Sequence, residues 1–190
     1  WEEPVISGEQ GSGTVFFTGC PLKCCFCQND KISIGHFGKE IRLAQLCEIF
    51  LELKRKGAVN INLVSSTQYI PWIAAAIEEL PADFSLPFVY NTGGYERVES
   101  LKMMDGHIQV YLPDIKYMDP ARSIRYAKAP DYFECCSESV LEMFRQVGRI
   151  RTDENGLLKS GLMIRHLVMP GGRHDSMKIL DWIAENLPRD

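Results

Sequence analysis

The sequence predicts an α/β fold with a parallel sheet, in the form of an incomplete (β/α) barrel within a single domain over residues 1–190. Short apolar runs of strand length alternate with amphipathic helical patterns along the chain. Polar clusters follow successive strands, at the carboxyl ends where barrel proteins build their sites. Only five strands are expected, and the chain starts at Trp1 instead of Met. We therefore expect part of the barrel to be missing from one or both termini.

Each expected element has its own local signal. The helix over 40–57 has a stripe of apolar residues at helical spacing and ends at Gly57. Pro71 marks the first turn of the next helix, and Pro130 divides a long helical region. A turn is expected at Asn155–Gly156. In order, we expect strand 13–19, helix 40–57, strand 59–64, helix 71–80, strand 87–91, helix 95–104, strand 107–116, a helical region over 120–148, a loop over 151–160, strand 161–170 and helix 174–187.

Composition excludes several classes of protein. With a net charge of −4, the chain has no general attraction to nucleic acid, and we expect no such partner. No apolar run reaches the length of a membrane span and the N-terminus is unlike a signal peptide, so no membrane association is expected. The seven cysteines are crowded instead of being spread as in a disulfide scaffold. This distribution indicates a reducing compartment, which we take to be the cytoplasm.

Four cysteines fall within the stretch FFTGCPLKCCFCQND. Thiolates are soft ligands that select zinc, copper(I) or iron–sulfur clusters. The spacing Cys20-x3-Cys24-x2-Cys27 puts three ligands on one tight loop, and no second cysteine pair lies at the distance typical of zinc sites. Three cysteines leave one iron of a [4Fe–4S] cluster open. His36 offers a fourth ligand for zinc, so a zinc- or cluster-binding module remains an alternative.

The cysteine loop, with Phe26 before its last cysteine, resembles the cluster motif of the radical S-adenosylmethionine (radical SAM) enzymes. The segments INLVSSTQYIPWI, VYNTGGYERVESLKMMDG, YLPDIKY and IRHLVMPGG are similar, in order and spacing, to uncharacterised homologues of pyruvate formate-lyase activating enzyme. The resemblance covers roughly residues 8–175. It implies a barrel of the radical SAM type and a [4Fe–4S] cluster held by Cys20, Cys24 and Cys27. Cys25 is expected to be a small, partly buried thiol outside this ligand set.

The resemblance also implies an activity. S-adenosyl-L-methionine would be the cofactor, cleaved reductively to a 5′-deoxyadenosyl radical that abstracts hydrogen from the substrate. A reducing electron donor is implied, and a glycyl-radical enzyme is implied as the protein substrate. The catalytic residues stay unknown, because nothing in the sequence specifies groups that touch the substrate.

Cofactor contacts are implied at the strand ends. Relatives carry Gly-Gly-Glu where this chain has Ser65-Ser66-Thr67, and a threonine brings no charge to the cofactor's ammonium. Asn91 stands where relatives hold the ribose with Asp, and Lys116 is the expected cation for the cofactor carboxylate. Of Arg165 and His166, only one is expected to face the lumen of the barrel. The expected set of cofactor-binding residues is Phe26, Ser65, Ser66, Thr67, Asn91, Asp114, Lys116 and Arg165.

Most of these residues also have a plainer explanation, in which they have a structural role and bind no cofactor. Phe26 would pack in the core, and the hydroxyls at 65–67 would cap a strand end or a helix. Asn91 would be a turn residue, and Asp114 with Lys116 would form a surface ion pair.

Overall fold

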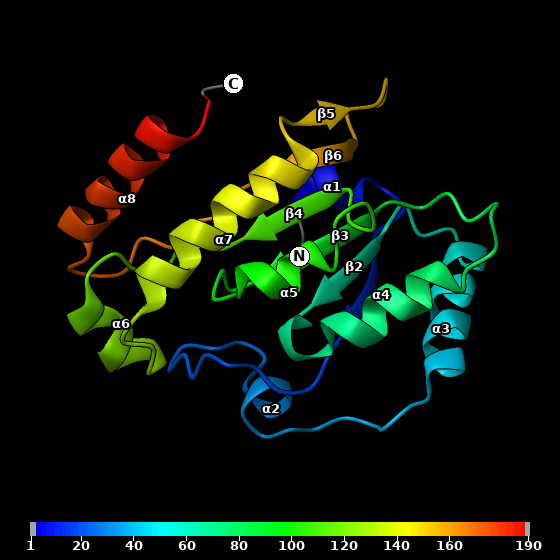
Figure 1. Cartoon of the computed structure of the whole chain (residues 1–190), viewed down its shortest axis with the longest axis horizontal. Coiled ribbons are helices and arrows are strands. Elements are labelled where there is room, and N and C mark those ends of the chain that lie inside the picture. The colour runs from blue at the N-terminus through cyan, green and yellow to red at the C-terminus, as the bar shows by residue number, and fades with distance from the viewer. Residues whose placement is uncertain (1–2, 189–190) are drawn as a thin grey trace.

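A computed structural model of the chain describes residues 3–188 (Figure 1). Over these residues the strands are β1 Gly13–Phe16, β2 Ile61–Val64, β3 Phe88–Thr92, β4 Val110–Pro113, β5 Arg151–Thr152 and β6 Leu158–Leu162. They form one sheet in the order β1-β2-β3-β4-β6-β5. All neighbours run parallel except β5, which is antiparallel to β6. The predicted parallel α/β sheet is therefore confirmed, but the sheet is open between the edges β1 and β5.

Helices form a row along one face of the sheet. Their bounds are α1 Pro4–Ser7, α2 Asp30–Ser33, α3 Leu43–Arg55, the 3-10 turn η1 Thr67–Tyr69, α4 Ile70–Glu78, α5 Val98–Lys102, α6 Pro120–Ala127, α7 Tyr132–Val147 and α8 Arg173–Asn186. In the row, α3 contacts α4, α4 contacts α5, and α5 contacts α7 (Figure 1). None of the helices within residues 3–188 has the length and apolar character that a membrane span needs.

Alternation along the strands divides the core between the two faces of the sheet. Ile61, Leu63 and Tyr90 point toward the row of helices and are fully buried there. Burial of each such apolar side chain contributes about 1.5–3 kcal/mol relative to exposure. On the other face, Val89 packs with Ile6 of α1 in a smaller buried cluster. Helix α1 thus covers part of this second face.

The strand predicted over 161–170 is wrong in its position. Strand β6 ends at Leu162, and only an isolated bridge between Asp114 and Arg165 continues the pairing. The apolar residues that follow do not alternate across a sheet, because Met163 packs beside α1 while Ile164 packs in the core under α6, α7 and α8. Part of the predicted loop over 151–160 instead forms the β5–β6 hairpin.

The turn predicted at Asn155–Gly156 is confirmed within that hairpin. The backbone N–H of Gly156 donates to the Asp153 carbonyl at 3.0 Å, and the N–H of Asp153 donates to the Leu157 carbonyl at 2.9 Å. Gly156 has a φ of +77°, which glycine adopts without strain.

The loop after β3 approaches the end of β4 and helix α7 too closely for a side chain. Gly94 has a φ of +78°, and a Cβ there would lie 2.5 Å from the Asp114 carbonyl oxygen and 2.7 Å from Cys136 Sγ. The Gly94 carbonyl in turn accepts a hydrogen bond of 2.9 Å from the buried hydroxyl of Ser139 in α7. This contact fixes the loop that follows β3 against helix α7.

We expect Gly94→Ala to lower the free energy of unfolding by roughly 2–4 kcal/mol, because left-handed strain adds to overpacking. Gly106→Ala is the matched control, since its φ is +84° and no atom lies within 4 Å of the added Cβ. The control should lose only about 1 kcal/mol from strain. Urea unfolding of the reduced proteins measures both changes, and equal losses would contradict the close packing at Gly94.

Candidate functional site

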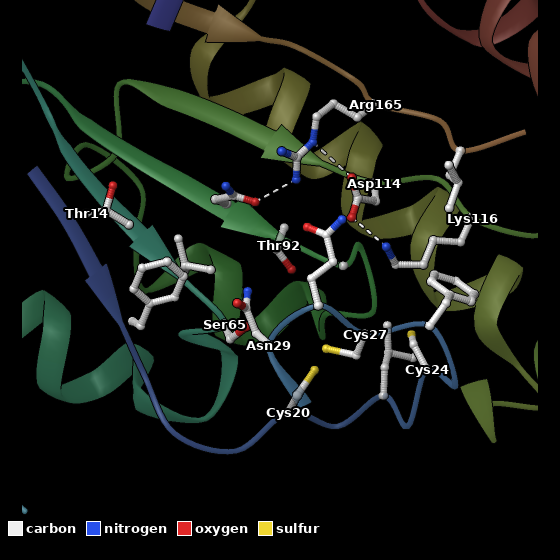
Figure 2. Close-up of a pocket in the computed structure, with 18 of the residues that line it drawn as sticks. Thr14, Cys20, Cys24, Cys27, Asn29, Ser65, Thr92, Asp114, Lys116 and Arg165 are labelled. Carbon is white, nitrogen blue, oxygen red and sulfur yellow. Dashed lines mark hydrogen bonds and ion pairs between the residues drawn. The ribbon is translucent and has the colours of Figure 1, made fainter. Parts of the chain in front are cut away.

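A cavity of about 1010 Å³ opens at the carboxyl ends of β1 to β4. It lies on the face of the sheet opposite the row of helices, and the cysteine loop borders it (Figure 2). Its lining includes Thr14, Phe16, Cys20, Cys24, Phe26, Cys27, Ser65, Asn91, Thr92, Asp114, Lys116 and Arg165. Polar residues from separate strand ends therefore meet the cysteine loop at one cavity, which is the arrangement that the sequence predicted.

Three cysteines of the loop share this cavity. All seven cysteines of the chain lie within the described residues, and only Cys20, Cys24 and Cys27 line it. Cys25 lies outside the cavity, but the expectation that it is partly buried is wrong, because its side chain is exposed. Figure 2 shows the three side chains gathered on one side of the cavity. No group of three or more His, Cys, Asp or Glu side chains among residues 3–188 is already placed to hold a metal ion. The donor set of three soft thiols fits a [4Fe–4S] cluster, and the sulfurs would have to converge to bind it.

Burial sets the protonation of two of these thiols. Burial raises the pKa of Cys20, and it raises the pKa of Cys24 to about 11, although the nearby Lys116 charge opposes the shift for Cys24. Both thiols are therefore neutral near pH 7. Metal binding would release their protons, as is usual for thiolate ligands.

Backbone and side-chain contacts hold the cysteine loop in place. The N–H groups of Lys23 and Cys25 donate to the carbonyls of Ala127 and Tyr126 at the end of α6, both at 2.9 Å. Leu22 is 3% exposed and packs in the core under α6, α7 and α8. These contacts attach the loop to a helix that is more than 90 residues later in the sequence.

A second anchor holds the chain just before the first cysteine. Gln68 Nε2 donates to the carbonyls of Thr18 at 2.6 Å and Gly19 at 2.9 Å. Gln68 lies in η1, which follows β2, so the turn after the second strand positions the start of the cysteine loop.

Charged side chains form a network at the β4 end of the cavity. Arg165 donates to Asp114 Oδ1 at 2.9 Å and to Asn91 Oδ1 at 2.7 Å, and Lys116 Nζ donates to Asp114 Oδ2 at 2.5 Å (Figure 2). The Lys116 side chain is only 14% exposed, so the pair with Asp114 is not the surface ion pair of the plainer explanation. Two cations thus share one carboxylate inside the cavity.

Arg165 and His166 both border the cavity, which differs from the expectation that only one would face inward. That expectation assumed a strand through both residues, whereas β6 ends at Leu162. The His166 ring makes contacts of 2.6 Å to the Ile115 carbonyl and 2.8 Å to Ser176 Oγ. Arg165 alone joins the charged network.

The three residues after β2 lie in different environments. Ser65 lines the cavity and has a φ of +58°, a left-handed conformation that is uncommon for serine and typical of functional sites. Ser66 is fully buried, and Thr67 begins η1 behind the cavity wall. Phe26 lines the cavity and also packs against the core under α6, α7 and α8, so it has the packing role that the plainer explanation gave it.

Glu96 was not predicted from the sequence. It is 3% exposed, and its Oε1 accepts hydrogen bonds from Thr67 Oγ1 at 2.7 Å and from Thr92 Oγ1. Its Oε2 is buried and has no hydrogen bond of standard geometry. Burial raises the pKa of Glu96 to about 7, an effect that the hydroxyls of Thr92, Thr67 and Tyr90 oppose. A glutamate in a polar loop is usually exposed, so local sequence gave no sign of this burial.

We expect Glu96 to make stability depend on pH. Its pKa is about 7 in the folded state and 4.5 in the unfolded chain, so its contribution is complete below pH 4.5 and is lost as pH rises through 7. Glu96→Gln should remove this dependence. Its stability relative to the unchanged protein should rise by roughly 2–3 kcal/mol between pH 5 and pH 8 in urea unfolding. Glu99→Gln, at an exposed position in α5, is the control, and an equal rise there would contradict the assignment.

Comparison with curated proteins gives one relative. The chain is 31% identical over 185 residues to the uncharacterised protein MJ0674 of Methanocaldococcus jannaschii. The match covers 93% of this chain and 50% of MJ0674, so the chain spans about half the length of that relative. No family model matches the sequence.

Comparison with solved structures gives the fold. SuiB of Streptococcus suis, in a crystal structure with bound S-adenosylmethionine, superposes with a TM-score of 0.61 at 15% identity over 91% of this chain and 38% of SuiB. SuiB bound to its precursor peptide SuiA superposes with a TM-score of 0.59 at 12% identity over 91% of this chain and 36% of SuiB. The chain therefore shares the fold of part of SuiB, an α/β fold with a mostly parallel sheet.

Proposed function

We propose that the chain is the core domain of a radical SAM enzyme. One observation carries the proposal: Cys20, Cys24 and Cys27 line the same cavity as the polar strand-end residues, while Cys25 stays outside it. This division matches a cluster held by three thiolates with one iron open for S-adenosyl-L-methionine. The shared fold with SuiB, a protein crystallised with S-adenosylmethionine, supports the same assignment. In this proposal the open sheet is part of an incomplete (β/α) barrel.

The side chains of the cavity have distinct roles in this function. Cys20, Cys24 and Cys27 would hold the [4Fe–4S] cluster, which supplies the electron for reductive cleavage of S-adenosyl-L-methionine to a 5′-deoxyadenosyl radical. Lys116 and Arg165 are the two cations at the β4 end, where they pair with Asp114 and, at 3.7 Å from Arg165, with Glu3; as hydrogen-bond donors they can orient the carboxylate of the cofactor.

Polar groups at the ends of β2 and β3 would orient the rest of the cofactor. Ser65 and Asn91 present a hydroxyl and an amide to the cavity, and both groups can bond to the ribose hydroxyls. Asn91 Oδ1 already accepts from Arg165, which leaves its amide N–H groups as donors. Phe26 borders the same space with an apolar ring that helps to exclude water.

For the substrate we propose a peptide or protein, with a glycyl-radical enzyme as the specific case implied by the sequence resemblance. SuiB in complex with its precursor peptide supports the broader class of peptide substrates for this fold. We further propose that a reducing protein donates the electron and that the enzyme works in the cytoplasm, where free thiols persist.

Anaerobic loading with iron and sulfide tests the proposal. We expect a brown protein whose electron paramagnetic resonance spectrum changes on addition of S-adenosylmethionine and which releases 5′-deoxyadenosine when reduced. Cys24→Ala should lose the brown colour, because it removes one ligand, and Cys25→Ala should retain it. A colourless protein that binds one zinc ion would refute the assignment. A cluster whose electron paramagnetic resonance spectrum does not change on addition of S-adenosylmethionine would refute it as well.

A further inference from the structure

The cavity wall contains a carboxyl group, that of Glu96, which has a pKa of about 7, is therefore partly ionised near neutral pH, and is compensated by no cation within the described residues. Glu96 is 3% exposed, and within residues 3–188 the groups that act on its pKa are hydroxyls, with no cation among them. A buried carboxylate normally pairs with a cation, because removal of a charge from water is costly. Its second oxygen, Oε2, has no hydrogen-bond partner of standard geometry in the described part of the chain.

This carboxylate lies directly behind the β2–β3 end of the cavity. Thr92, which donates to Glu96 Oε1, lines the cavity itself. The Glu96 charge also acts on Cys20, which lines the cavity from the cysteine loop. Figure 2 shows Ser65, Thr92 and Cys20 bordering the cavity on the side of the strand ends.

Two threonine hydroxyls direct their hydrogens at Glu96. Thr67 and Thr92 each donate their hydroxyl hydrogen to Oε1, so the oxygen lone pairs point away from the carboxylate. The Gly94 N–H already donates to Thr92 Oγ1 at 3.2 Å. Thr92 Oγ1, which borders the cavity, therefore keeps one acceptor lone pair while its hydrogen is committed to an acid, and this suits a positively charged donor.

The two ends of the cavity thus differ in their ionisable groups. Lys116 and Arg165 lie at the β4 end with Asp114 between them, and Glu96 lies behind the β2–β3 end. A neutral glutamine could accept the same two hydroxyl hydrogen bonds with a smaller desolvation cost, so packing alone does not explain an acid at this position.

We propose that Glu96 is a positioning residue that makes the β2–β3 end of the cavity select the positively charged α-ammonium of S-adenosyl-L-methionine, acting through Thr92. The inference rests on the proposed function. It assigns to a residue after β3 the negative charge that the segment Ser65-Ser66-Thr67 lacks.

The test measures equilibrium binding with the anaerobic, cluster-loaded protein. Isothermal titration calorimetry gives the dissociation constants of S-adenosylmethionine and of its analogue without the α-amino group. Glu96→Gln should weaken binding of S-adenosylmethionine about tenfold and that of the analogue by less than about twofold, because only the former carries the ammonium. Glu99→Gln in α5 is the matched control and should change neither constant.

Equal weakening of both ligands by Glu96→Gln would show a merely structural role and overturn the inference, as would no weakening of either. If the unchanged protein binds no S-adenosylmethionine at all, the proposed function fails, which is a distinct result. Circular dichroism establishes that each variant is folded. Should Glu96→Gln not fold, Thr92→Val provides the second test. It should weaken binding of S-adenosylmethionine about threefold and leave binding of the analogue unchanged, and equal effects on both would again overturn the inference.

Discussion

The attachment of the cysteine loop to the end of α6 is the contact on which the site depends. Two backbone hydrogen bonds and the burial of Leu22 hold residues 20–27 against a helix far along the chain. Without them the thiols would lie on a free loop, and its entropy would oppose their meeting the strand ends. The glycine at position 93 completes the contact, since a Cβ there would lie 2.8 Å from Leu22 Cδ1.

The sequence predicted the elements whose signals are local. Apolar runs such as INLV at 61–64 gave the central strands, and the cysteine spacing gave the loop that borders the cavity. The strand over 161–170 failed, because its apolar residues belong to two separate clusters that only the folded chain defines. Glu96 was missed for the same reason, since its burial depends on Thr67, which lies 29 residues earlier.

The two ends of the cavity carry different ionisable groups. At the β4 end, Lys116 and Arg165 share Asp114, and Arg165 lies 3.7 Å from Glu3 as well. At the other end, Glu96 is screened by hydroxyls alone. Because the effective dielectric constant is lower near buried groups, these charges act more strongly on a bound molecule than surface charges do. A ligand with a cation and an anion a few bonds apart matches both ends at once.

Lys116 connects the charged network to the cysteine loop. Its ammonium pairs with Asp114 and also lowers the pKa of Cys24 against the larger effect of burial. A ligand anion that approached Lys116 would therefore act on the same cation that favours the Cys24 thiolate. The backbone N–H of Lys116 donates to the Tyr132 hydroxyl at 3.0 Å. The single hydrogen of that hydroxyl is shared between the carbonyl oxygens of Gly93 and Asp114, each 2.8 Å away. The buried tyrosine thus fixes the backbone of this lysine, and the fold sets the distance between the cofactor-orienting charges and the thiols.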